Sequence, residues 1–311
     1  MYVGSVRFFK HLILSVIALL IIIPTVGCVY FAVQYQSLKA LNFEQIAEYS
    51  ATDEKDAHEG GGLDILAVYA SDETAIEDEP VARALSYQTL YPQLYVENDF
   101  SFITETENTV YLTFDDGPTS LTPQVLNILK EHGIVATFFV LYQTGDEARA
   151  LYNRIVDEGH TLAVHSATHD YRVIYQSVEA FLEDFAALSD MLVEVTGVQP
   201  EIFRFPGGSF NRYNMIIQQE LIAEMLRRGY QYYDWDVSSG SSTNTATRES
   251  IYSNVMRGIS GRKQAVVLMH DAGTSATVAA LPDIITSLKA SGYTFEALDK
   301  TIRPVCFNYT N

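Results

Sequence analysis

The sequence is poor in cysteine, with only Cys28 and Cys306 among its 311 residues. Cys28 lies in an apolar run and Cys306 lies near the end of the chain, so we do not expect a disulfide between them. A framework of disulfides, as in small secreted domains, is therefore excluded. A chain of this length can bury a hydrophobic core without covalent links.

Positive charge is also scarce. The chain has 20 lysine and arginine residues against 39 aspartate and glutamate residues, which gives a net charge of −19. A nucleic-acid partner requires a basic surface, so this composition argues against nucleic acid. The excess of negative charge is unevenly distributed along the chain, because residues 41–108 hold 16 acidic residues and only two basic ones, Lys55 and Arg83. Much of the negative charge thus belongs to the first third of the chain.

One long apolar run lies near the start of the chain. Residues 12–33 are apolar or small apart from Ser15 and Thr25, and their number suits the roughly 20 residues of a membrane-spanning helix. Arg7 and Lys10 precede the run, so we predict a cytoplasmic amino terminus. Residues 1–34 are then a cytoplasmic tip and a single-pass anchor in the cell membrane, with the rest of the chain extracellular. A cleaved signal peptide, or a lipidated one at Cys28, is the alternative.

Residues 35–86 are acidic and show no periodic pattern, and they include three consecutive glycines. We predict a mostly disordered tether for this region. Large apolar side chains then recur every three or four residues, namely Tyr87, Leu90, Tyr91, Leu94 and Tyr95. This spacing predicts an arm that packs on the domain that follows, so we assign residues 87–311 to one domain with a core at 109–300.

Strand and helix patterns alternate through that core. Short apolar runs predict strands at 110–114, 136–140, 161–165, 202–205, 231–237, 265–270 and 293–297. Amphipathic patterns predict helices at 123–132, 147–158, 177–196, 215–228, 248–259 and 276–290. Such alternation indicates an α/β fold with a parallel sheet and helices outside it. Seven units would close naturally as a (β/α) barrel one unit short of eight, with its chemistry at the carboxyl ends of the strands.

Ionisable side chains lie at the carboxyl ends of five of the seven predicted strands. They are Asp115, Asp116, His165, His169, Arg204, Asp234, Asp236, His270 and Asp271. Three of the seven histidines belong to this set, whereas His132 and His160 fall at helix ends, where a structural role is more common. The carboxyl ends of parallel strands open on one rim, so we expect these groups to meet.

The spacing of His165 and His169 is typical of a metal site when a carboxylate joins them. Two histidines and one aspartate suit Zn²⁺, and also Co²⁺, Fe²⁺ or Ni²⁺, and they leave positions open for water and substrate. Of the adjacent Asp115 and Asp116, one carboxylate is then spare and can take a proton from water. A histidine on the far side can give a proton to a leaving group. This combination is that of a hydrolase for an amide or an ester.

Four motifs occur in order: TFDDGP at 113–118, HSATH at 165–169, RFPGG at 204–208 and LMH at 268–270. Residues 109–300 therefore resemble the polysaccharide deacetylase domain of carbohydrate esterase family 4, which includes chitooligosaccharide and peptidoglycan deacetylases. The resemblance implies a distorted seven-unit (β/α) barrel, which agrees with the strand count. It also implies a divalent metal cofactor, with zinc as the first choice.

The resemblance assigns roles to the residues that match these motifs. They are Asp115 as general base, Asp116, His165 and His169 as metal ligands, Arg204 as the partner of the base, and His270 as general acid. Four further residues are implied to contact substrate. They are Gly207 through its backbone N–H, Leu268 as a wall of the acetyl-methyl pocket, and Pro206 and Trp235 as sides of the sugar-binding groove.

The chain departs from the family at one position. Members often have W-D-x-x-S-G-D, in which the last aspartate supports the acid histidine, and here Ser241 takes its place. Without that carboxylate the protonated form of His270 should be less stable and its ring less fixed. We therefore expect reduced or pH-shifted activity. Asp234 or Asp236 is a possible substitute for the missing carboxylate.

These observations predict a membrane-anchored, metal-dependent deacetylase of N-acetylated cell-wall glycan, with GlcNAc or MurNAc of peptidoglycan as its substrate. A second hypothesis keeps the domain and changes the substrate to an O-acetylated polysaccharide such as xylan. A third is a catalytically impaired glycan-binding protein, which only Ser241 supports.

Overall fold

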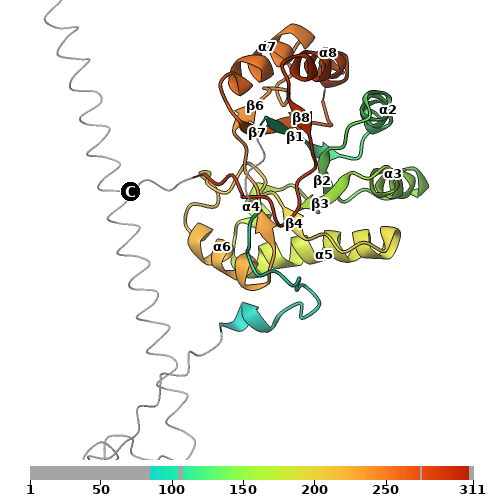
Figure 1. Cartoon of the computed structure of the whole chain (residues 1–311). Helices are drawn as coiled ribbons and strands as arrows, with labels where there is room; N and C mark the ends of the chain where they lie inside the picture. The colour runs from blue at the N-terminus through green and yellow to red at the C-terminus, as the bar shows by residue number, and fades with distance from the viewer. Residues whose placement is uncertain (1–84, 104–107, 274, 308–311) are drawn as a thin grey trace, which may run out of the picture. The chain divides into compact units, whose positions relative to one another are not determined.

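A parallel sheet of eight strands forms the centre of the domain (Figure 1). The computed structural model describes residues 85–103, 108–273 and 275–307, which all belong to one unit, Ala82–Asn311. The strands are β1 Thr109–Gly117, β2 Thr137–Leu141, β3 Thr161–Ser166, β4 Ile202–Phe203, β5 Gln231–Tyr232, β6 Val237–Ser238, β7 Gln264–His270 and β8 Thr294–Phe295. The helices are η2 Ser86–Thr89, α2 Thr122–His132, α3 Asp146–Asp157, α4 Tyr171–Ile174, α5 Val178–Thr196, α6 Gln218–Arg227, α7 Arg248–Ile259 and α8 Ala276–Ala290.

The sheet has the order β5-β4-β3-β2-β1-β7-β6, and its pairs are parallel. Strand β8 pairs with Thr109 and Val110 at the start of β1, on an edge that β2 reaches only from Thr113 onward. The predicted strand 231–237 is divided into β5 and β6, which lie at opposite ends of this order. In the described chain no ladder joins these two strands. The sheet is therefore curled and open, where we had predicted a seven-unit barrel.

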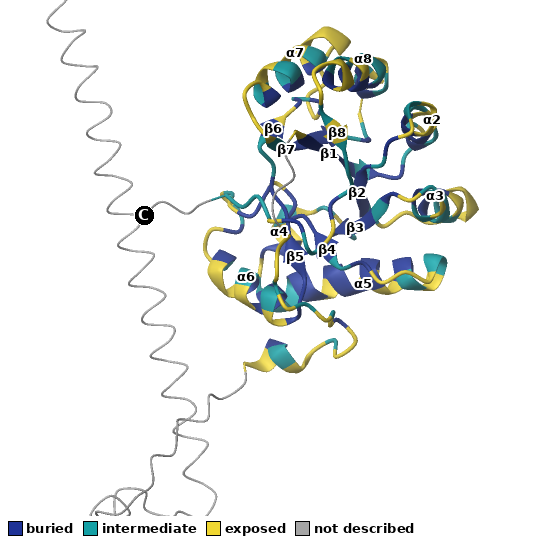
Figure 2. Cartoon of the chain, in the orientation of Figure 1, coloured by how far each residue is buried: buried dark blue, intermediate teal, exposed yellow. Residues whose placement is uncertain are grey.

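Alternation along the strands produces two apolar layers. On β1, the side chains of Val110, Leu112 and Phe114 belong to the larger core between sheet and helices, whereas Tyr111 belongs to a smaller core on the inner face. The helices turn their buried sides toward the sheet and their exposed sides away from it (Figure 2). Successive strand residues point to opposite faces, so every second residue of a strand lines the inside of the curl.

The carboxyl-terminal segment covers part of the inner face. The hydroxyl of Tyr233 donates to the carbonyls of Asp299 and Ile302 at 2.7 and 2.6 Å, and the N–H of Asp234 donates to Val305 at 2.7 Å. Ile302 is itself part of the inner core. This segment therefore lies against Tyr233 and Asp234, the two residues that come directly after β5, where the sheet is open.

The starts of α5 and α7 are fixed by N-cap side chains, which accept a backbone N–H of the first helical turn. Ser177 accepts the N–H of Ala180 at 3.2 Å at the start of α5, and Thr247 accepts that of Ser250 at 3.1 Å at the start of α7. All six predicted helices are present, and α7 and α8 have the predicted bounds. The short helices η2 and α4 were not predicted, because one turn carries no periodic pattern.

The amino-terminal arm packs on the domain near the end of α6. Tyr87 and Leu94 are buried, and the arm is held by the fully buried side chain of Arg228. Its guanidinium donates to the carbonyls of Tyr87, Leu90, Tyr91 and Leu94 and to the carboxylate of Glu224. The arm thus satisfies a buried cation at the end of α6.

The predicted anchor at 1–34 and the tether at 35–86 lie outside the described residues, apart from Leu85 and Ser86. Within the described ranges, no helix has the length and apolar character needed to cross a membrane.

We expect Arg228→Met to lower the free energy of unfolding by about 3 kcal/mol, because several carbonyls of the arm lose a buried donor. Arg257→Met, on the exposed side of α7, should change the unfolding free energy by less than about 0.5 kcal/mol. Urea denaturation of both variants measures the difference. Equal stabilities would show that the arm does not depend on this guanidinium.

Candidate active site

The predicted site residues meet at the carboxyl ends of the strands, on the inner face of the curl. Along β1 and β3, Asp115 and His165 continue the rows that begin with the inner-core residues Tyr111 and Ala163. Arg204 follows Ile202 of β4 in the same way, and His270 continues the row of Val266 on β7. All of these rows lie on the same face of the sheet. Asp115 and His270, which are 155 positions apart in the sequence, therefore lie in one site.

Asp116 would point away from its neighbour Asp115 in a regular strand. The ladder between β1 and β2 is irregular here, because Asp115 pairs with Phe139 and Gly117 pairs with the next residue, Val140. Asp116 is left unpaired as a bulge, and its φ of 71° is in the left-handed region. Bulges are rare in parallel ladders and redirect a side chain. This one directs Asp116 toward the histidines, so both carboxylates face the site.

A candidate metal site is formed by Asp116, His165 and His169, whose possible ligand atoms all lie within 4.8 Å of one another. Oδ1 of Asp116 lies 3.6 Å from Nε2 of His165 and 3.4 Å from Nε2 of His169. Donor atoms that surround one Zn²⁺ tetrahedrally, each about 2.1 Å from it, are roughly 3.4 Å apart. Oδ1 of Asp116 is buried and accepts no hydrogen bond from the described residues. These residues therefore fit a divalent cation.

His165 is held in the tautomer that a metal ligand needs. Its Nδ1 lies 2.8 Å from the carbonyl oxygen of Arg204, which can only accept, so Nδ1 carries the proton and Nε2 has a free lone pair. Burial lowers the pKa of His165 to about 3, although the nearby carboxylate of Asp116 opposes this effect. The imidazole is therefore neutral near pH 7, as metal binding requires.

Asp115 is fixed by Arg204, whose side chain is completely buried. Nη1 of Arg204 donates to Oδ1 of Asp115 at 2.8 Å, and Oδ2 of the same carboxylate lies 3.8 Å from Nε2 of His165. Burial raises the pKa of Asp115, and the Arg204 guanidinium acts in the opposite direction. One oxygen is thus committed to the arginine while the other faces the candidate metal site.

His270 is supported by serine hydroxyls. Oγ of Ser241 lies 3.0 Å from Nδ1 of His270 and also accepts the backbone N–H of that residue at 2.9 Å. Ser239 extends the chain of hydroxyls at 2.9 Å from Ser241. Asp234 instead binds Ser209 and the backbone of Phe307, and Asp236 binds Arg262 and the N–H of Val266. In the described contacts, neither aspartate replaces the missing carboxylate.

The four residues predicted to contact substrate lie around this rim. Leu268 is on the inner face of β7, two residues before His270, and Trp235 is partly exposed beside Arg204. Pro206 is buried, and its carbonyl accepts the hydroxyl of Tyr175 at 2.8 Å. Gly207 is exposed with a φ of 75°, and a Cβ there would lie 3.3 Å from the hydroxyl of Tyr171. Glycine is therefore needed at position 207.

Sequence reasoning missed Asp184, a buried residue of α5. Its carboxylate accepts hydrogen bonds of 2.7–2.8 Å from the loop between the two histidines, namely from the hydroxyl of Ser166, the N–H of Ala167, and the N–H and hydroxyl of Thr168. Its signal in the sequence was a charged residue on the apolar face of an amphipathic helix. Asp184 therefore positions the loop that carries His165 and His169.

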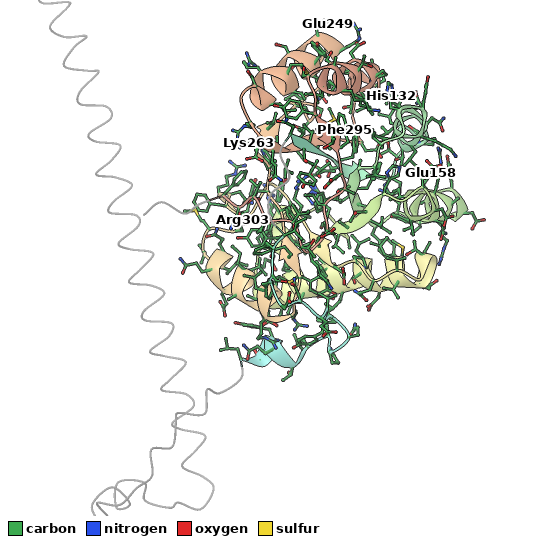
Figure 3. All side chains as sticks on the ribbon, viewed as in Figure 1. His132, Glu158, Glu249, Lys263, Phe295 and Arg303 are labelled. Atoms are coloured by element: carbon green, nitrogen blue, oxygen red, sulfur yellow. The ribbon has the colours of Figure 1, made fainter. Side chains whose placement is uncertain are left out.

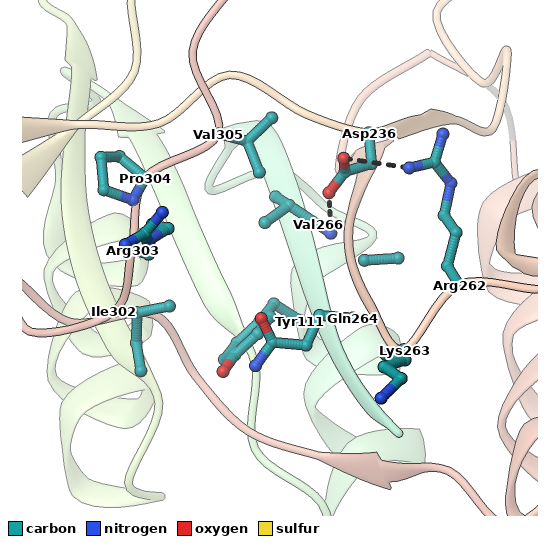
Figure 4. A pocket seen from close by; sticks show the side chains of 11 residues that line it. Tyr111, Asp236, Arg262, Lys263, Gln264, Val266, Ile302, Arg303, Pro304 and Val305 are labelled. Atoms are coloured by element: carbon teal, nitrogen blue, oxygen red, sulfur yellow. Dashed lines mark hydrogen bonds and ion pairs between the residues drawn. The ribbon is translucent and has the colours of Figure 1, made fainter. Parts of the chain in front are cut away.

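A cavity of about 320 Å³ lies away from this rim (Figure 4). It is lined by Tyr111 and Gln264, which precede Asp115 and His270 by four and six residues, or by roughly 13 Å or more of strand. Lys263 and Arg303, labelled in Figure 3, contribute basic side chains, and the cavity contains no histidine. It is separate from the candidate active site.

Comparison with known proteins identifies the family. Residues 103–226 match the polysaccharide deacetylase model. The chain is 33% identical over 207 residues to a peptidoglycan-N-acetylglucosamine deacetylase of Bacillus cereus, covering 65% of this chain and 73% of the relative. It is 28% identical over 249 residues to the peptidoglycan-N-acetylmuramic acid deacetylase PdaA of Bacillus subtilis, covering 76% and 90%.

A solved structure supports the same assignment. The catalytic domain of a peptidoglycan N-acetylglucosamine deacetylase from Eubacterium rectale superimposes with a TM-score of 0.64 at 34% identity, covering 68% of this chain and 97% of that one. The chain belongs to the polysaccharide deacetylase family. Its members are hydrolases, so this protein is an enzyme of that class.

We expect Asp184→Asn to weaken metal binding by about 10- to 100-fold, because an amide cannot accept all four hydrogen bonds that hold the histidine loop. Asp190→Asn, on the exposed side of the same helix, is the matched control and should leave affinity unchanged. Calorimetric titration with Zn²⁺ compares the variants. Equal affinities for Asp184→Asn and wild type would exclude a positioning role.

Proposed function

We propose that this protein hydrolyses N-acetyl groups on cell-wall glycan, with GlcNAc or MurNAc of peptidoglycan as the substrate, and releases acetate. The two Bacillus relatives are named for these two sugars, which supports both choices. The observation that carries the proposal is the position of Asp115. One of its oxygens is bound by Arg204, and the other faces a two-histidine, one-carboxylate site.

Asp116, His165 and His169 would hold a divalent cation, and we propose Zn²⁺, with Co²⁺, Fe²⁺ or Ni²⁺ as alternatives. When bound, the cation supplies Lewis-acid chemistry to the acetamide carbonyl and to water. We propose that the side chains of Asp115 and His270 perform the proton transfers of the reaction.

Asp115 is proposed as the general base. Its Oδ2 is the oxygen not committed to Arg204, so this atom takes the proton from the attacking water. The raised pKa of the buried carboxyl makes it a stronger base than an exposed aspartate. Arg204 keeps the carboxylate oriented while the proton moves.

His270 is proposed as the general acid, opposite the base on the neighbouring strand β7. Its Nδ1 is occupied by Ser241, so Nε2 is the atom that protonates the departing amine. The exposed N–H of Gly207 is proposed to donate to the oxyanion, and Leu268 to contact the acetyl methyl group. Together these groups convert an acetamide and water into acetate and an amino sugar.

We also propose that residues 12–33 anchor the chain in the cell membrane with the enzyme domain outside, where peptidoglycan lies. Membrane fractionation followed by protease treatment of intact cells tests this placement. Recovery of the protein in the cytosolic fraction would rule out the anchor.

The wild-type chain should release acetate from peptidoglycan and chitooligosaccharides, and Asp115→Asn should lower kcat by about 10²- to 10⁴-fold. Chelation should abolish release and Zn²⁺ should restore it. Acetylxylan serves as the competing substrate, and faster release from it would favour the O-acetyl esterase hypothesis. Glycan binding without acetate release would instead favour the impaired, glycan-binding hypothesis.

Ser241→Asp should raise kcat/KM by roughly tenfold near neutral pH, because a hydrogen bond from protonated His270 to a carboxylate is worth about 1.5 kcal/mol or more. Ser241→Ala should lower kcat/KM, since Nδ1 loses its partner. The pH–rate profiles of wild type, Ser241→Asp and Ser241→Ala measure these effects. A profile of Ser241→Asp identical to that of wild type would contradict the proposed role of the hydroxyl.

A further inference from the structure

The carboxyl-terminal segment reaches the rim of the proposed active site. The buried carboxylate of Asp234 accepts the N–H of Phe307 at 2.7 Å through Oδ2. The same carboxylate accepts the N–H of Ser209 at 2.7 Å through Oδ1, and the backbone N–H of Asp234 donates to Val305. One aspartate thus fixes the segment against the loop that follows Arg204.

The ring of Phe307 contacts two residues of that rim. It meets Trp235 edge to face, with ring centroids 4.8 Å apart and an interplanar angle of 81°. It also lies against Gly208, where a Cβ would be only 2.7 Å from the Phe307 ring. Gly208 follows the proposed oxyanion donor Gly207, and Trp235 lies 5.8 Å from the guanidinium carbon of Arg204. Phe307 therefore touches Trp235 and lies beside the residue that follows Gly207, two residues for which a substrate contact is predicted.

We infer that Phe307 is a substrate-binding residue that forms, with Trp235, an aromatic corner for a sugar ring next to the acetylated one. This inference rests on the proposed function and narrows it to oligomeric glycan. Both side chains are only partly buried, so each ring presents some of its surface to a ligand. Rings set at right angles can cover two sides of a sugar at little entropic cost, because the Phe307 backbone is already fixed by Asp234.

A purely structural role for Phe307 makes a different prediction. Loss of an edge-to-face pair would lower stability and would affect substrates of every length alike. A binding role affects only substrates long enough to reach the corner. Substrate length therefore separates the two roles, and the removal of a large apolar contact from a binding site typically changes affinity by about tenfold.

The experiment compares full-length wild type, Phe307→Ala and Phe307→Tyr on N-acetylglucosamine oligomers of two and five residues. We expect Phe307→Ala to raise KM for the pentamer by about tenfold, to leave kcat within twofold, and to leave the dimer unaffected. Phe307→Tyr keeps the ring and should restore the wild-type KM. Tyr95→Ala, which truncates a partly exposed ring of the amino-terminal arm, is the matched control and should change neither constant.

Calorimetric binding of the pentamer to metal-free protein separates this inference from the proposed reaction. Weaker binding by Phe307→Ala than by wild type would support the corner even if no acetate were released. Unchanged binding, or an equal loss of kcat/KM on both oligomers, would overturn it.

Discussion

The buried guanidinium of Arg204 is the constraint on which the site depends. It donates to the hydroxyl of Thr113, to Oδ1 of Asp115 and to the carbonyls of Tyr233 and Asp234, and it lies 4.1 Å from the centre of the Phe139 ring. An unpaired charge at this depth would be very costly, so these partners must keep their positions in the folded protein. Strand β1 and the chain beyond β5, which share no ladder in the described residues, are thereby held at a fixed separation on either side of this guanidinium.

The long strands were predictable because buried parallel strands are continuous apolar runs, and β1, β3 and β7 lie within a few residues of their expected positions. The division of 231–237 into β5 and β6 was not predictable. Between them the backbone of Asp234 and Asp236 bonds to Val305 and Val266, and neither of these partners is encoded by a local pattern. The predicted parallel α/β sheet is confirmed, and it curls into a half-barrel. Whether such a sheet closes depends on contacts between distant segments, so the strand count alone did not predict that it stays open.

The candidate site was likewise predictable where local motifs specify it and unpredictable where it depends on distant contacts. Asp116, His165 and His169 could be identified because motifs place them at strand ends, where parallel strands converge. The direction of Asp116 depends on a bulge that only the register reveals. Asp184 and Phe307 are absent from every motif, because their partners are loops that lie elsewhere in the sequence. Motifs thus point to the candidate site residues, and the tertiary structure reveals the residues that contact and position them.

The amino-terminal arm changes where the folding unit begins. The family match starts at residue 103, yet Arg228 finds four of its acceptors between Tyr87 and Leu94. A fragment cut at the family boundary would leave this cation with the carboxylate of Glu224 but without those carbonyls. Limited proteolysis of the native chain should accordingly stop before residue 86, and the smallest fragment that keeps its heat stability should retain the arm.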